Sequence, residues 1–328
     1  MYFFISYLRV IAAVLITNSH YAQIWPIADM AVGGMIGNIL FFAVSGFCLY
    51  HVKGNFGKWI LKRILKIYPV MIGFTLLTIL IGDFSINSGK DLVYFFVYPT
   101  NYIFLVWLMI SYVAFYFVTW ISKTYQKCLE ITLLVLLSAW ILTYFLAVDK
   151  SIYHIDEVSK PFILFLYFAS MLMGALFKKH EIKFQRVRLS HVLLLPLSLL
   201  VYFGSKVAFS KIEKIVFWQI LNQASILFVL YLIFALALSC ESKMKVGPKW
   251  LNRGITFLSK MTLHIYIVQF AVIRRLETLS FPINFVVVTV AILALAIAVY
   301  HVEQFIRQGL VTLFQRTDKE EKNAKDSN

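Results

Sequence analysis

The chain has 328 residues, of which 61% are hydrophobic and only 14% charged, and its mean hydropathy is +0.80. A soluble domain usually carries charge on about a quarter of its residues, so this composition excludes an ordinary water-soluble protein. The formal net charge of +15 would suit a nucleic-acid partner, but the positions of the charges, given below, favour another cause.

Apolar runs long enough to cross a bilayer recur along the whole chain. The strands of a membrane barrel would alternate in polarity, whereas 129–148 and 216–239 are apolar at consecutive positions. Because backbone in lipid must satisfy its own hydrogen bonds, such runs form helices. We therefore predict an all-α integral membrane protein of about ten transmembrane helices. The predicted helices cover 3–22, 30–50, 64–82, 102–122, 129–147, 161–177, 189–204, 216–239, 255–273 and 284–306.

The charges between these helices predict the orientation of the chain. Alternate loops, together with the tail from residue 307, hold 22 of the 31 Lys and Arg residues. This asymmetry is the positive-inside pattern, and it predicts that both termini are cytoplasmic. The positive charge is thereby explained by topology in a lipid bilayer, and we expect no nucleic-acid partner. Lys206, Lys211 and Lys214 run against the trend, so the helix count near 189–215 is open.

The chain is expected to form one membrane domain, residues 1–310, followed by a short polar cytoplasmic tail, residues 311–328. The first apolar run begins at Tyr2 without a basic leader or a small-residue cleavage site, so we expect it to be retained as a helix. The last part of the tail, 317–328, is expected to be disordered. The three cysteines, Cys48, Cys128 and Cys240, have a spacing that suits no metal site, and we expect no bound metal.

The first helix carries two polar groups that are costly in a bilayer and are therefore functional candidates, Arg9 and His20. Eleven residues on an α-helix amount to three turns plus about 20°, so both side chains share one face, roughly 16 Å apart along the axis. With a cytoplasmic N-terminus, Arg9 lies near the inner surface and His20 lies past the midplane. A neutral imidazole can accept the proton of an attacking hydroxyl, and an arginine can bind an anionic donor. The structural alternatives are a hydrogen-bonded interfacial histidine and a snorkelling arginine.

The second and third predicted helices carry further candidates. Ser45 and Gly46 permit close contact between helices, or close approach of a ligand to the backbone. Arg63 and Lys66 are three residues apart, so they are neighbours on one helix face at the inner surface. There they are able to bind diphosphate, and the alternative is a topological or lipid-binding basic cluster.

These segments together resemble the acyltransferase-3 family of multi-pass bacterial membrane proteins. Its pattern begins with an arginine, ten residues and a histidine, as in Arg9 to His20. A Phe-Phe-x-x-Ser-Gly-Phe element follows, here 41–47, and then an Arg-x-x-Arg-x-Tyr-Pro element, here 63–69. Weaker matches are found further along the chain at Asn101, Trp107, Tyr112, Gly174, the segment 262–269 and Glu303. The resemblance spans roughly residues 5–307.

The resemblance implies an enzyme that transfers an acyl group, usually acetyl, from cytoplasmic acyl-CoA to a hydroxyl of a glycan. It implies that His20 is the catalytic base, that Arg9 is a donor or transition-state partner, and that Arg63 contacts a phosphate of CoA. Lys66, Ser45 and Gly46 are the further donor-binding candidates. Acetyl-CoA is then a co-substrate, and no tightly bound cofactor is expected. The implied location is the bacterial plasma membrane, where other polysaccharide-biosynthesis proteins are candidate partners.

Four residues in the later part of the chain are substrate-contact candidates: Trp107, Tyr266, Gln269 and Glu303. For Trp107 and Tyr266 the alternative is ordinary aromatic packing. Glu303 has Arg307 four residues further on, so an intrahelical ion pair is its structural alternative.

Two positions depart from the family pattern. Lys66 replaces the second arginine, which exchanges a bidentate phosphate ligand for a point charge. Gln269 stands where the family often has histidine. His264, five residues earlier, lies about 140° away around the helix and cannot simply replace it.

These departures keep two other functions open. One is a flippase or exporter for polysaccharide or lipid-linked sugars, although the sequence shows no pair of Gly/Pro-broken helices of the kind that transporters use. The other is a catalytically silent scaffold of a polysaccharide assembly machine. The sequence names neither the acceptor glycan nor the acyl chain.

Overall fold

The computed structural model describes residues 2–276 and 279–326, with side chains described as far as residue 308. The described residues form helices joined by turns and loops, with no strand among them. The long and medium helices are α1 (Phe3–Ser19), α2 (Gly34–Leu49), α3 (Phe56–Leu80), α5 (Ile103–Ile121), α6 (Cys128–Ala147), α7 (Ile163–Lys179), α8 (Leu189–Lys211), α9 (Ile220–Ser239), α11 (Lys249–Lys260), α12 (Thr262–Leu276) and α13 (Ile283–Asp326). Shorter turns of helix are η1 (Ala28–Met30), α4 (Gly89–Leu92), η2 (Val93–Val97), η3 (Thr100–Tyr102), η4 (Glu181–Phe184), η5 (Glu213–Trp218) and α10 (Glu241–Val246).

All ten predicted segments are helical, and the fold class is that of a multi-pass membrane protein. Within the described part of the chain, seven helices are long and apolar enough to cross a bilayer, and the bent pair α11–α12 would make eight. The number is lower than the ten predicted spans because some of the helices are short. A span needs roughly 20 residues, whereas α1 and α7 have 17 each and α12 has 15.

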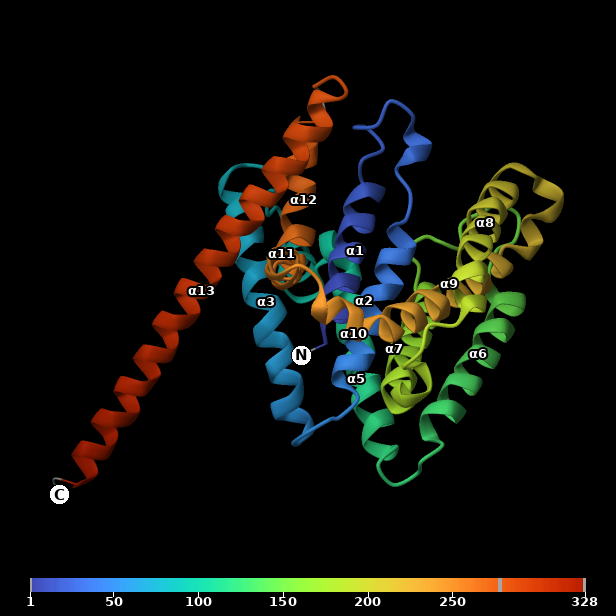
Figure 1. The fold of residues 1–328 in the computed structure, drawn as a ribbon. Coiled ribbons are helices and arrows are strands. Elements are labelled where there is room, and N and C mark those ends of the chain that lie inside the picture. The colour runs from blue at the N-terminus through green and yellow to red at the C-terminus, as the bar shows by residue number, and fades with distance from the viewer. Residues whose placement is uncertain (1, 277–278, 327–328) are drawn as a thin grey trace.

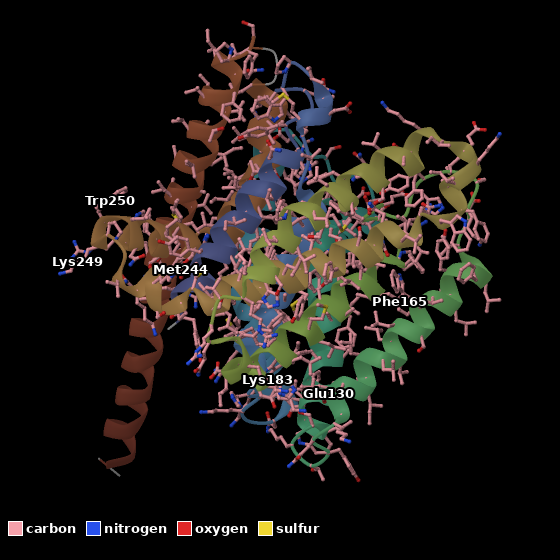
Figure 2. The ribbon with its side chains drawn as sticks, turned by 45° about the vertical axis from the view of Figure 1, so that its right-hand side comes forward. Glu130, Phe165, Lys183, Met244, Lys249 and Trp250 are labelled. Atoms are coloured by element: carbon pink, nitrogen blue, oxygen red, sulfur yellow. The ribbon has the colours of Figure 1, made fainter. Side chains whose placement is uncertain are left out.

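The single helix predicted at 255–273 is in fact two helices that meet at Met261 with a bend of 67°. The physical reason is a change in composition, because α11 is strongly amphipathic whereas α12 is apolar and largely buried. Figure 2 shows Lys249 and Trp250 on the outer side of α11, away from the helix bundle. An amphipathic helix with exposed basic and aromatic side chains is suited to lie along a membrane surface.

The last helix is also longer than expected. The sequence predicts a span at 284–306 and a disordered segment at 317–328, but α13 continues as one helix to Asp326. Its C-terminal part extends away from the other helices (Figure 1). Residues 327–328 lie outside the described part of the chain.

Helices α1 and α2 lie at the centre of the bundle (Figure 1), and α2 is the most deeply buried of the spans. Helix α2 crosses α7 at Gly46 and Gly174, where a Cβ on Gly46 would overlap the backbone carbonyl of Met171, and a Cβ on Gly174 that of Ala43. Small residues at such a crossing let the two backbones touch, which is how helices associate in lipid. Helices α6 and α8 are peripheral and turn most of their surface outward.

The N-terminal end of α1 is fastened to its neighbours by polar contacts. Glu241 of α10 accepts hydrogen bonds from the first main-chain N–H groups of α1, at Phe3 (3.1 Å) and Phe4 (2.8 Å). Glu181 binds Lys178 at 2.7 Å and accepts a hydrogen bond from the Tyr2 hydroxyl at 2.9 Å. Burial would raise the pKa of the Glu181 carboxyl, but these hydrogen bonds outweigh it and lower that pKa. Arg9 and His20 therefore lie on a firmly held helix.

Candidate active site

A cavity of about 480 Å³ lies between α1, α2, α3, α5, α12 and α13, and we call it the basic cavity. Its described lining includes six cationic side chains and one carboxylate, that of Glu303. The cationic residues are Arg9, Lys62, Arg63, Lys66, Lys260 and Arg307. Three of the residues predicted to meet the donor or to act in catalysis, Arg9 of α1 and Arg63 and Lys66 of α3, are thus brought together from two different stretches of sequence. A concave site with this excess of positive charge is suited to a ligand with several negative charges.

The guanidinium of Arg63 is available to such a ligand. It lies over the ring of Trp59, 5.1 Å from the ring centroid, and its buried Nε has no hydrogen-bond partner among the described residues. Among the described residues, the hydrogen-bond partner of Arg9 is the sulfur of Cys48, at 3.8 Å. A buried donor without a partner is costly, so the Arg63 Nε is best satisfied when an anion is bound.

Ser45 and Gly46, predicted together as donor contacts, have different surroundings. Ser45 lines the basic cavity and accepts a hydrogen bond of 3.4 Å from the Tyr112 hydroxyl. Gly46 is buried on the other side of α2, at the crossing with α7. The glycine therefore serves helix packing, and the serine is the member of the pair that a ligand would meet.

Glu303 makes the predicted intrahelical pair with Arg307, at 2.6 Å, and also a contact that sequence reasoning missed. Its other oxygen lies 2.9 Å from Nε2 of His264 on α12, and both residues line the basic cavity. Nδ1 of His264 is buried and has no partner among the described residues. The pairing joins α12 to α13 across 39 positions of sequence. Only the presence of two polar residues in apolar helices hinted at it.

A second cavity, of about 910 Å³, contains His20, and we call it the histidine cavity. It meets a smaller cavity of about 380 Å³, with which it shares His20, Asn101 and Phe270. His20 directly follows α1, and its ring lies 4.5 Å from that of Phe270. The ring nitrogens of His20 make no hydrogen bond to another described residue, so the imidazole is open to a ligand in either cavity.

The wall of the histidine cavity carries a polar network that the sequence analysis did not predict. Asp156 binds Lys206 at 2.8 Å and accepts a hydrogen bond of 2.7 Å from the Tyr153 hydroxyl. The other oxygen of Asp156 is buried without a partner in the described structure. The network also explains Lys206, which seemed to oppose the charge pattern: α8 continues to Lys211, and Lys206 is neutralised by an aspartate. The only sign of this network in the sequence was that Lys206 did not fit the charge pattern of the loops.

The remaining substrate candidates lie in three different settings. Tyr266 lines both cavities. Trp107 lines neither, and its indole N–H donates to the carbonyl of Val158 at 2.8 Å, which fastens the loop after α6 to α5. Gln269 is fully buried and accepts a hydrogen bond of 2.9 Å from Thr17, which ties α12 to α1 one turn before His20. Of these three candidates, only Tyr266 lines a cavity, whereas Trp107 and Gln269 hold neighbouring segments together.

The arrangement places a cavity lined by cationic side chains and the His20 imidazole at different positions along one bundle. Arg9 and His20, roughly 16 Å apart along α1, open onto different cavities, and these cavities share Phe104 and Tyr266. A long ligand with an anionic end in the basic cavity is therefore able to direct its other end toward the imidazole. A neutral imidazole there can act as a general base.

Comparison with known proteins shows the family of the chain. No curated protein and no solved structure matches the chain. The model of one family, described as an acyltransferase domain, matches residues 2–301. Because this match covers most of the 328 residues, the chain belongs to the acyltransferase-3 family and is a membrane acyltransferase.

Proposed function

We propose that this acyltransferase moves an acyl group, acetyl by the family resemblance, from cytoplasmic acyl-CoA to a hydroxyl of a cell-surface or lipid-linked glycan. The proposed location is the bacterial plasma membrane, alongside other enzymes of polysaccharide synthesis. One observation carries the proposal: cationic side chains gather in one cavity, and an unpaired imidazole faces the adjoining one.

The basic cavity supports a CoA ester as the donor. The nucleotide end of CoA carries several phosphate charges, and Arg63, Lys66 and Arg9 offer cationic groups that make no ion pair with a described carboxylate. The charge distribution of the chain predicts that this cavity opens to the cytoplasm. The arm of CoA is long and unbranched, which suits a thioester that reaches toward His20.

The histidine cavity supports a glycan as the acceptor. Its size leaves room for sugar rings, and Asp156, Lys206 and Tyr153 offer a carboxylate, an ammonium group and a hydroxyl to sugar hydroxyls. In the proposed step, His20 accepts the proton of the acceptor hydroxyl as its oxygen attacks the thioester carbonyl. The C–O bond forms, the C–S bond breaks, and CoA leaves as a thiolate. The proton on the imidazole then passes to the thiolate or to water.

The test is transfer of label from radioactive acetyl-CoA to glycan by the purified protein in vesicles. We expect the wild-type protein to label the glycan and His20→Ala to lose at least 100-fold in rate, since general base catalysis contributes about 10²–10⁴-fold. His51→Ala, an exposed histidine outside both cavities, is the matched control and should keep wild-type activity.

Two other outcomes would contradict the proposal. Translocation of a lipid-linked sugar without any acyl donor would indicate a flippase or exporter. Normal glycan modification in cells that carry His20→Ala, together with its loss on deletion of the protein, would indicate a scaffold that acts through another enzyme.

A further inference from the structure

Two aromatic side chains, Phe104 of α5 and Tyr266 of α12, separate the basic cavity from the histidine cavity. They are the residues that line both cavities in the described structure. Their rings are 5.4 Å apart, and both side chains are buried, with exposed fractions of 6% and 9%. They therefore form a barrier, which we call the Phe104–Tyr266 barrier, rather than the rim of an open channel.

One side of the barrier is held in place by a layer of aromatic rings. Phe104 packs edge-on against Phe42, with ring centroids 5.4 Å apart, and lies 6.1 Å from Tyr167. Phe42 and Tyr167 are stacked at 4.5 Å and are fully buried, and the Tyr167 hydroxyl accepts a hydrogen bond of 2.9 Å from Asn38. Closely packed rings of this kind resist displacement, so Phe104 presents a fixed surface.

The other side, Tyr266, is also packed among aromatic rings. Besides Phe104, the ring of Tyr266 contacts Tyr102 and Phe270, each with centroids 6.2 Å away. The ring of Phe270 in turn lies against His20, at 4.5 Å. Anything that passes the barrier must therefore displace the ring of Tyr266 or that of Phe104.

The barrier has a direct consequence for the donor, and this step rests on the proposed function. The cationic groups that would hold the nucleotide lie in the basic cavity, and His20 lies in the other two cavities. The thioester must pass between Phe104 and Tyr266 to reach His20. Only there can the imidazole accept the proton of the glycan hydroxyl that attacks the thioester. Whatever is attached to the thioester carbonyl must pass first.

We propose that the Phe104–Tyr266 barrier selects the acyl chain of the donor, and that it admits acetyl-sized groups and rejects longer ones. A two-carbon group is the smallest acyl chain and displaces these packed rings least. Each added methylene must displace packed aromatic rings, and packed interiors tolerate added volume poorly. A difference of one methylene in such a site typically changes kcat/KM about 10-fold or more.

The experiment compares kcat/KM for acetyl-CoA and butyryl-CoA with purified protein and one glycan acceptor. Phe104→Leu widens the passage and should raise the butyryl-to-acetyl ratio about 10-fold, whereas Phe104→Trp narrows it and should lower the ratio. Phe115→Leu is the matched control, because it makes the same change at a fully buried position of α5 that lines neither cavity. That variant should keep the wild-type ratio.

The outcomes separate this inference from the proposed function. An active Phe104→Leu protein with an unchanged ratio would overturn the selector while leaving the acyltransferase reaction intact. Transfer from neither donor by the wild-type protein would overturn both. Gel filtration of each variant shows whether it is folded, and Tyr266→Leu supplies a second widened barrier if Phe104→Leu fails to assemble.

Discussion

At the scale of single residues, the site depends on charges that have no protein partner. Arg63 has a buried Nε without an acceptor in the described chain, and Arg9 donates to a thiol rather than to a carboxylate. Glu303 behaves differently, since it binds both His264 and Arg307. In the basic cavity, the charge of Arg307 is thus neutralised by Glu303, whereas Arg9 and Arg63 remain available to a ligand.

The free cations predict how donor affinity responds to mutation. Arg63→Ala should raise the KM for acyl-CoA about 10- to 100-fold, because a hydrogen bond to a charged group contributes about 1.5–3 kcal/mol. Lys66→Arg should lower that KM, because a guanidinium binds phosphate bidentately. Steady-state kinetics at saturating acceptor provide the measurement. Lys58→Ala, on the same helix but outside the cavity, is the control, and an equal effect of Lys58→Ala and Arg63→Ala would refute the assignment.

The Glu303–His264 contact predicts an energetic coupling between α12 and α13. Glu303→Ala leaves an imidazole that is 3% exposed without its partner, and we expect a loss of about 1–3 kcal/mol in stability. Thermal unfolding in detergent of Glu303→Ala, His264→Ala and the double variant measures the coupling. Additive effects of the two single changes would show that the contact contributes nothing.

At the scale of elements, the close crossing of α2 and α7 places Ser45 in the basic cavity wall. The backbones touch at Gly46 and Gly174, on the side of α2 that faces away from the cavity. The residue that precedes α9, Gln219, likewise shapes the loop after α6. Gln219 accepts hydrogen bonds from the main-chain N–H groups of His154 and Ile155, each at 3.0 Å, which positions the neighbouring Asp156.

The close crossing predicts that alanine substitutions at different glycines will change the melting temperature by different amounts. Gly46→Ala and Gly174→Ala each place a methyl group against the backbone of the other helix. We therefore expect the free energy of unfolding to fall by about 1–3 kcal/mol and the melting temperature to decrease. Gly204→Ala on α8 meets open space and should leave the melting temperature unchanged or slightly raised, since alanine favours helix. Equal melting temperatures for all three variants would contradict the close packing.

At the scale of the whole molecule, the bundle places a cationic cavity toward one end of α1 and a cavity with an accessible histidine toward the other. The asymmetry of Lys and Arg residues predicts that the cationic end faces the cytoplasm. The bend between α11 and α12 belongs to the same arrangement, because α12 contributes His264 and Tyr266 to the basic cavity while α11 remains at its edge with Lys260.

This orientation predicts the sidedness of chemical labelling at Cys48, which is exposed and lines the basic cavity. In a variant with Cys128→Ser and Cys240→Ser, a membrane-impermeant maleimide should label Cys48 in inverted vesicles and not in intact cells. Desulfo-CoA, which lacks a thiol, should slow the labelling by occupying the cavity. Labelling from outside intact cells would reverse the topology and remove the cytoplasmic donor.

The sequence by itself determined the properties that depend on neighbouring residues. Hydropathy located each helical segment, charge asymmetry predicted the orientation, and the spacing of Arg9, His20 and Arg63 identified the family. Contacts between distant segments were decided only by the tertiary structure: the His264–Glu303 pair, the Asp156–Lys206 network, the bend at Met261 and the separation of Gly46 from Ser45. The Phe104–Tyr266 barrier belongs with these. Aromatic residues are so frequent in this chain that no local signal marks them, and their role arises solely because two cavities meet there.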